Sequence, residues 1–178
     1  MFISYFSHGR TALKYGLKSI KNINSILVPN FICDAVTNTI KKENIEIIYY
    51  RVKSNFEPDW SHLQTLSTEK TSAILMMHFF GIPQNINKFI EFASKNKLTL
   101  IEDNAHGYGG KYNSVFLGDI GDLSISSPRK LCNTPSGGIL KLNNKDLYNN
   151  ISYNLKKYPL SFRQKLSFLH REKFSNSK

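Results

Sequence analysis

Hydrophobic residues follow two different patterns along this chain. In residues 11–21, Leu13, Leu17 and Ile20 fall on one face of a helix. The same spacing, or a similar mixture of apolar and polar residues, predicts further helices at residues 33–42, 61–66, 85–96 and 145–157. Short runs rich in β-branched and aromatic residues lie between them and predict strands. The expected strands cover residues 26–28, 45–50, 72–78, 98–103, 122–126 and 138–142.

Two of these strands are apolar almost throughout. Residues 72–78 and 98–103 show no polar alternation until their ends, which is typical of strands covered on both faces. Strands that alternate with helices predict an α/β domain of three layers, with a mostly parallel sheet and helices on both faces. Ligands of such sheets bind beyond the carboxyl ends of the strands. We therefore expect the functional residues directly after the strands.

Composition narrows the class of protein. The chain has 178 residues, enough for one domain, and its 40% hydrophobic and 21% charged content is typical of globular proteins. No apolar stretch approaches the ~20 residues of a membrane span, and residues 1–10 lack the pattern of a signal peptide. The two cysteines, Cys33 and Cys132, are far apart and form no motif. We therefore expect a cytoplasmic protein with reduced thiols and no membrane partner.

The net charge of +11 is concentrated in part near the end of the sequence. We expect the domain to cover residues 1–158 and a basic tail to follow at residues 159–178. From residue 156 onward basic residues exceed acidic ones, because Glu172 is the one acid beside Lys156, Lys157, Arg163, Lys165, Arg171, Lys173 and Lys178. Such a bias is compatible with a nucleic acid or a membrane surface. The tail contains no recognisable nucleic-acid-binding module, so we interpret it as a solvated basic helix and expect no nucleic-acid partner.

Three places could carry chemistry. Asp103 ends a buried strand, where it could face a ligand or cap the following turn. Lys130 follows the strand at residues 122–126; it could be a nucleophile toward carbonyl groups if its environment lowers its pKa, or an ordinary surface lysine. Gly9, Arg10 and Thr11 open a helix, whose free N–H groups could bind a phosphate or simply start the helix. The histidines and cysteines show no metal-ligand spacing, so we expect no metal.

Taken in order, these segments resemble the DegT/DnrJ/StrS family of sugar aminotransferases, which depend on pyridoxal 5′-phosphate. The landmarks extend from Gly9 to Leu142, and their joint order and spacing make the resemblance specific. They are Gly9-Arg10-Thr11-Ala12-Leu13, Ile26-Leu27-Val28-Pro29, Ala73 to Pro83, Ile101-Glu102-Asp103-Asn104-Ala105-His106-Gly107, Gly118-Asp119-Ile120-Gly121-Asp122, and Ser127-Pro128-Arg129-Lys130 with Pro135-Ser136-Gly137-Gly138.

The resemblance implies a role for each matching residue. Lys130 corresponds to the lysine that forms a Schiff base with the cofactor, and Asp103 to the acid that keeps the pyridine nitrogen protonated. His106 matches a position near the ring and its phenolic oxygen. The remaining matches concern the phosphate: the helix start at Gly9, Arg10 and Thr11, and one further contact from Ser126 or Ser127. Many members stack an aromatic residue on the ring from near Cys33, and the nearest aromatic here is Phe31.

The resemblance also implies a fold, an activity and partners. The fold is the large domain of fold type I transferases, here partial, because the C-terminal small domain of the family lies outside these residues. The activity is transfer of an amino group, from an amino-acid donor such as glutamate, to a nucleotide-linked keto-sugar for surface polysaccharide or related amino-sugar synthesis. Full-length members are homodimers. The alternative is a binding or regulatory module that keeps the fold without turnover.

Overall fold

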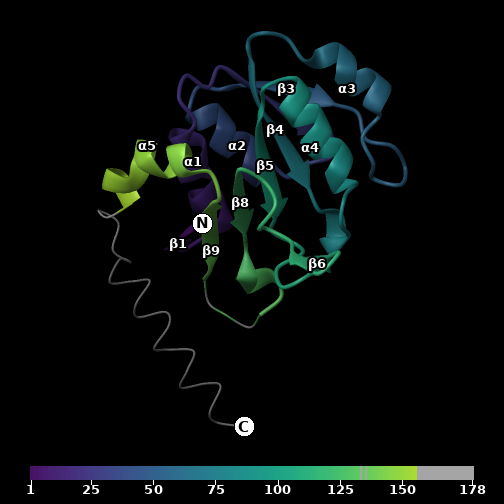
Figure 1. Ribbon diagram of the computed structural model, residues 1–178. Coiled ribbons are helices and arrows are strands. Elements are labelled where there is room, and N and C mark those ends of the chain that lie inside the picture. Colours follow the sequence, from purple (N-terminus) through teal and green to yellow (C-terminus); the bar gives the residue numbers. More distant parts are fainter. Residues whose placement is uncertain (133, 135, 156–178) are drawn as a thin grey trace.

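The structure, a computed structural model, describes residues 1–132, 134 and 136–155 (Figure 1). Its main sheet is built from seven strands: β1 (Phe2–Phe6), β2 (Ser25–Pro29), β3 (Glu46–Tyr50), β4 (Thr71–Met77), β5 (Thr99–Asn104), β8 (Leu123–Ser126) and β9 (Gly138–Leu142). Their order is β1-β9-β8-β5-β4-β2-β3. Strand β9 runs antiparallel to both of its neighbours, and the other pairs are parallel. The expected, mostly parallel sheet is confirmed.

Helices cover both faces of this sheet. Helices α1 (Gly9–Ser19), α2 (Asp34–Lys42) and α5 (Lys145–Leu155) pack on one face, and α3 (Trp60–Leu66) and α4 (Ile86–Lys95) on the other. Two short 3-10 turns, η1 (Phe79–Gly81) and η2 (Pro128–Lys130), follow β4 and β8. The hairpin of β6 (Lys111–Tyr112) and β7 (Val115–Phe116) forms a separate small sheet. The three-layer arrangement agrees with the sequence pattern.

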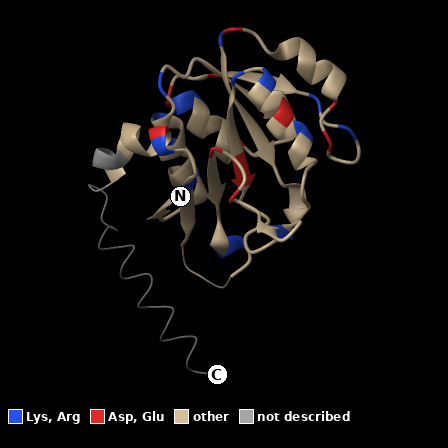
Figure 2. Ribbon diagram, viewed as in Figure 1, with Lys and Arg blue, Asp and Glu red and all other residues tan. Residues whose placement is uncertain are grey.

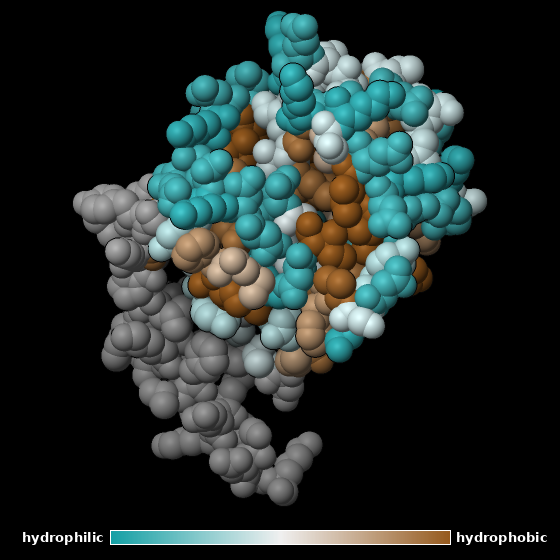
Figure 3. Space-filling model, viewed as in Figure 1, coloured by the Kyte–Doolittle hydropathy of each residue, from teal (hydrophilic) through white to brown (hydrophobic). Residues whose placement is uncertain are grey.

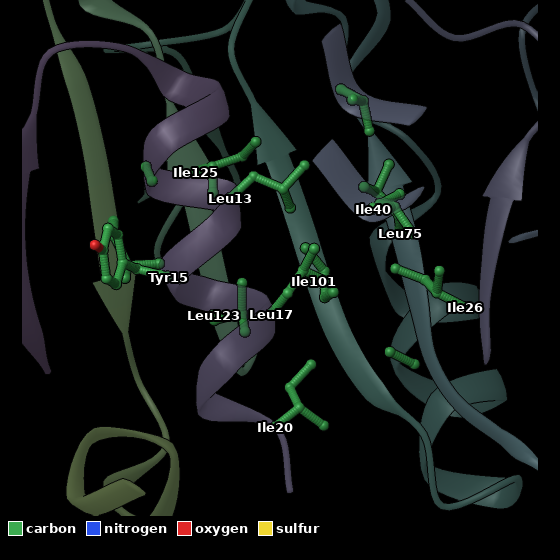
Figure 4. Close-up of a cluster of buried hydrophobic side chains, with 14 of the residues drawn as sticks. Leu13, Tyr15, Leu17, Ile20, Ile26, Ile40, Leu75, Ile101, Leu123 and Ile125 are labelled. Atoms are coloured by element: carbon green, nitrogen blue, oxygen red, sulfur yellow. The ribbon is translucent and has the colours of Figure 1, made fainter. Parts of the chain in front are cut away.

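The larger core lies between α1 and the middle of the sheet. Leu13 and Leu17 project from α1 toward Ile101 of β5 and Leu123 of β8 (Figure 4), and all four side chains are fully buried. This apolar contact fixes α1 against β5 and β8. Apolar residues also reach the surface (Figure 3), and several large ones are more than one-third exposed: Tyr5, Phe31, Phe80, Ile82 and Leu131.

Strand β1 and the small hairpin were not expected from the sequence. Strand β1 pairs with β9 from Phe2 opposite Leu142 to Phe6 opposite Gly138. A side chain on Gly138 would lie 2.2 Å from the backbone carbonyl of His8, so glycine is required where these two strands meet α1. The expected basic tail at residues 159–178 lies outside the described residues.

Among the described residues, no helix has the length and apolar character needed to span a membrane.

Candidate active site

A cleft opens where the carboxyl ends of β5 and β8 meet the first turns of α1 and α2. It holds about 510 Å³ of empty space, a volume that includes open solvent at its mouth. Its lining comes from segments far apart in the sequence: His8, Gly9, Arg10, Cys33, Ala35, Val36, Met77, Asp103, Ala105, Ile125, Ser127, Arg129 and Lys130. Five of the residues singled out from the sequence, Gly9, Arg10, Asp103, Ser127 and Lys130, are therefore brought together.

Asp103 is the acid of this cleft. It lies near the end of β5, is 2% exposed, and its Oδ1 accepts a hydrogen bond from the N–H of Ala105 at 3.0 Å. Burial raises the pKa of this carboxyl group, although the Ala105 N–H and the positive charge of Lys130 act in the opposite direction. A partner that brings an N–H group or a positive charge would therefore favour the ionised form of Asp103.

Lys130 approaches the same cleft from the 3-10 turn η2. The turn is closed by a hydrogen bond from the N–H of Lys130 to the carbonyl of Ser127 at 3.0 Å, and the lysine side chain is exposed. Basic η2 and the acidic end of β5 lie at the same edge of the sheet (Figure 2). Among the described residues, no carboxylate lies within 4.0 Å of Arg10, Arg129 or Lys130. The cleft therefore carries an excess of positive charge.

The start of α1 forms one wall of the cleft. A side chain on Gly9 would lie 3.5 Å from Cβ of Ser127 and 3.6 Å from the carbonyl oxygen of Ser126, so the helix start packs closely against the end of β8. The first N–H groups of a helix have no partner within it and lie at the positive end of its dipole. In α1, the N–H of Thr11 already donates to the carbonyl of His8, which leaves the N–H groups before it as the candidates. The first turn of α1 contains no acidic residue. This wall is suited to bind a phosphate, together with the guanidinium group of Arg10.

The two candidate serines face opposite sides of the sheet. Ser127 lines the cleft, and its hydroxyl group lies 3.5 Å from the carbonyl oxygen of Gly137. The Oγ of Ser126 lies on the other face, 3.5 Å from where a side chain on Gly118 would begin. Of the two alternatives left open by the sequence, the structure therefore places Ser127 in the cleft.

Thr11 and His106 lie near the cleft but are not part of its lining. Thr11 is half-buried in the first turn of α1, where its N–H donates to the carbonyl of His8 at 3.0 Å. The Nδ1 of His106 accepts a hydrogen bond from the N–H of Phe80 at 3.3 Å, and the two rings stack with centroids 6.2 Å apart. Burial and the charge of Lys130 lower the pKa of His106, which favours its neutral form.

Several lining residues were not identified from the sequence. Cys33, which precedes α2, lines the cleft, whereas Phe31 is 54% exposed and packs against Phe56 and Phe79, with ring centroids 5.8 Å apart in both pairs. Phe31 is not part of the lining. Small residues such as Ala105 carry no chemical signal of their own, so only the fold reveals them. The described residues include no group of three or more histidine, cysteine or acidic side chains that could hold a metal ion.

Comparison with known proteins assigns this arrangement to a family. Residues 5–172 match the DegT/DnrJ/EryC1/StrS aminotransferase family. The chain belongs to this family. The GDP-perosamine synthase of Escherichia coli O157:H7 is 31% identical over 147 residues, which cover 80% of this chain and 40% of the relative. The chain thus spans about two fifths of that relative's length.

Solved structures agree with the assignment at the level of the fold. The aminotransferase PseC of Helicobacter pylori superposes with a TM-score of 0.77 at 18% identity, covering 91% of this chain and 46% of PseC. NtdA of Bacillus subtilis, solved with the cofactor PMP bound, gives a TM-score of 0.74 at 22% identity, covering 84% of this chain and 35% of NtdA. The DegT/DnrJ/EryC1/StrS aminotransferases depend on pyridoxal phosphate, and the fold of this chain is the corresponding part of their large domain.

Proposed function

We propose that this chain binds pyridoxal 5′-phosphate in the cleft and serves the transfer of an amino group from an amino acid, glutamate by resemblance, to a nucleotide-linked keto-sugar. The observation that carries the proposal is that one cleft contains a buried acid, Asp103, and an exposed lysine, Lys130, beside a helix start suited to a phosphate. These three features correspond to the ring nitrogen, the aldehyde group and the phosphate group of the cofactor. The relative from Escherichia coli, named a GDP-perosamine synthase, supports the sugar part of the proposal.

Each residue then has a distinct task. When bound, the cofactor supplies the electron sink that amino transfer requires. The carboxylate of Asp103 accepts a hydrogen bond from the ring nitrogen and keeps a proton there, which offsets the cost of its own burial. Lys130 would hold the aldehyde carbon of the cofactor through its amine, and the same amine, when free, would move a proton at the substrate carbon. The hydroxyl group of Ser127 and the first-turn N–H groups of α1 hold the phosphate.

The first test is spectroscopic. The purified chain with pyridoxal 5′-phosphate should develop the visible absorption of a lysine-bound cofactor, and reduction with borohydride should leave a stable label on Lys130, found by peptide mass spectrometry. The Lys130→Ala variant should lose both the absorption and the label. The matched control is Lys141→Ala, since Lys141 instead pairs with Asp119. Failure of the parent chain to bind the cofactor, or labelling mainly at other lysines, would overturn the proposal.

A second candidate is a module that binds the cofactor without turnover. The matched residues cover 40% of the Escherichia coli relative, so the likeness to that synthase extends to two fifths of its length and not to the rest. Incubation with glutamate separates the two functions. Conversion of the bound cofactor to its amine form, and then amination of a GDP-linked keto-sugar, would support the transferase, whereas an unchanged spectrum would support the binding module.

A further inference from the structure

A buried polar pair lies behind Asp103, on the opposite face of β5. Side chains alternate along this strand, so that Ile101 and Asp103 face α1 and α2, while Leu100 and Glu102 face α3 and α4. Glu102 and His78, the residue after β4, are both fully buried, and the His78 Nε2 lies 2.9 Å from the Glu102 Oε1. A buried carboxylate is costly unless its hydrogen bonds are satisfied, which makes its partners informative.

The partners of Glu102 fix the loop that precedes β8. Its Oε1 also accepts the N–H of Gly118 at 2.6 Å, and its Oε2 accepts those of Ile120 and Gly121 at 3.0 Å each. Burial raises the pKa of Glu102, but the hydrogen bonds from His78, Gly121 and Gly118 outweigh this effect and leave the pKa below its ordinary value. Glu102 is therefore an ionised carboxylate with four donors around it.

The geometry also defines the state of His78. Its Nδ1 accepts a hydrogen bond from the N–H of Gln84 at 3.2 Å, so the ring proton is on Nε2 and is donated to Glu102. A doubly protonated ring would place a second donor against the Gln84 N–H. The backbone N–H of His78 donates to the carbonyl of Asp103 at 3.1 Å. His78 therefore contacts the side chain of Glu102 and the main chain of Asp103.

The loop at residues 117–121 has little freedom to move away from β5. A side chain on Gly121 would lie 2.9 Å from the carbonyl oxygens of Leu100 and Leu123, so the loop backbone touches the sheet directly. The Nδ2 of Asn104 donates to the carbonyl of Leu117 at 2.7 Å. Strand end and loop therefore form one rigid unit, whose hydrogen bonds centre on Glu102.

We propose that Glu102 and His78 are positioning residues, which hold the end of β5 so that the carboxyl group of Asp103 is directed into the cleft. The inference rests on the proposed function, because Asp103 is the residue that meets the cofactor. Glu102 and Asp103 are neighbours on one strand. If Glu102 loses its hydrogen bonds and the strand end tilts, the side chain of Asp103 therefore turns with it. Binding groups must be held within about 0.5 Å of their working position, so even a small tilt would weaken cofactor binding.

Two substitutions at His78 separate positioning from general stability. In His78→Gln, the side-chain nitrogen can take the place of Nε2 and still donate to Glu102. In His78→Asn, the side-chain oxygen can take the place of Nδ1 and accept from the Gln84 N–H, but Glu102 loses the donor from His78. Leu63→Ala is the matched control: Leu63 is fully buried in the core on the same face of the sheet and makes no contact with this hydrogen-bond network that the structure records. Thermal midpoints are measured for all three variants.

The readouts are the dissociation constant of pyridoxal 5′-phosphate and the amide hydrogen exchange of Ala105, whose N–H binds the Asp103 carboxyl group. We expect His78→Asn to weaken cofactor binding about tenfold, as loss of an orienting partner does at metal sites. His78→Gln should stay close to the parent chain. Leu63→Ala should lower the thermal midpoint without changing either readout.

The outcomes of the experiment are distinct. If affinity and exchange in the three variants simply follow their thermal midpoints, or if His78→Asn binds as tightly as the parent, Glu102 and His78 have no positioning role. If the parent chain binds no cofactor, the proposed function fails, but amide exchange still tests the positioning role. Faster exchange at Ala105 in His78→Asn, with unchanged exchange in His78→Gln and Leu63→Ala, would support that role. Unchanged exchange in all variants would overturn it.

Discussion

Replacement of Asp103 by asparagine should change stability and cofactor binding in opposite directions. Asp103 is 2% exposed, and burial raises the pKa of its carboxyl group, so its ionisation at neutral pH costs the folded protein free energy when no cofactor is bound. Asparagine has nearly the same shape, and its Oδ1 can still accept the hydrogen bond from the Ala105 N–H. The substitution therefore removes the charge and retains the local structure.

The sign of the pH dependence follows from the raised pKa. An acid whose pKa is higher in the folded state than in the unfolded state binds more protons when folded. Its contribution to stability is therefore complete at pH values below its unfolded pKa. That contribution is lost as the pH rises through its folded pKa. Parent and Asp103→Asn should therefore differ little in acid and most at neutral pH. Because Asp103 keeps one hydrogen bond and the attraction of Lys130, we expect a gain of about 1 kcal/mol, or about 2–4 °C in Tm for a chain of 178 residues.

Thermal unfolding without cofactor, from about pH 3 to about pH 8, measures this gain. Cofactor titration at neutral pH should in turn show much weaker binding by Asp103→Asn, since a neutral amide cannot hold a proton on the ring nitrogen. Asp119→Asn is the control, because Asp119 is partly exposed and pairs with Lys141, and it should not gain stability. The reasoning is refuted if cofactor-free Asp103→Asn is less stable than the parent at neutral pH.

Further predictions concern the core, the glycines and the phosphate site. Leu13→Ala should cost about 2–5 kcal/mol in urea unfolding, because a fully buried side chain is removed. Gly138→Ala should prevent soluble folding, since the added methyl group would lie 2.2 Å from the carbonyl of His8. Gly109→Ala meets no atom within 4 Å and bears only the strain of its φ of +84°, so it should stay folded and lose about 1 kcal/mol. Ser127→Ala should weaken binding of pyridoxal 5′-phosphate but leave binding of unphosphorylated pyridoxal unchanged, as measured by titration.

Strands of the sheet could be predicted from the sequence where burial on both faces requires apolar residues. Strands β4 and β5 lie in the middle of the sheet, covered on both faces, and their continuous apolar runs identified them. Strand β1 lies at the edge, and most of its residues are exposed. The segment Phe2–Phe6 is rich in aromatic residues but was not predicted as a strand, and its pairing with β9 defines it. Hairpin strands of two residues, such as β6 and β7, are too short for any periodicity to show.

The candidate site was predictable to the extent that its residues follow strands. Asp103 and Lys130 were found in this way, and the structure places both on one cleft. Cys33 and Arg129 also line it, but nothing in a single sequence distinguishes them from exposed residues of a loop. The position of His106 beside the ring stays a prediction: its Nδ1 accepts the N–H of Phe80 and the residue is not part of the lining, but it interacts electrostatically with Asp103 and Lys130.

The strongest guide to the remaining residues is the alternation of side chains across a strand. The motif that ends β5 contains two adjacent acids, and composition treats Glu102 and Asp103 alike. Alternation places them on opposite faces, so that one carboxylate meets four protein donors and the other borders an open cleft with one. Ser126, the last residue of β8, and Ser127, which follows the strand, likewise face opposite sides. A carboxylate whose hydrogen bonds are all made within the protein is suited to stabilise the structure. A carboxylate that can still accept hydrogen bonds is suited to bind a ligand.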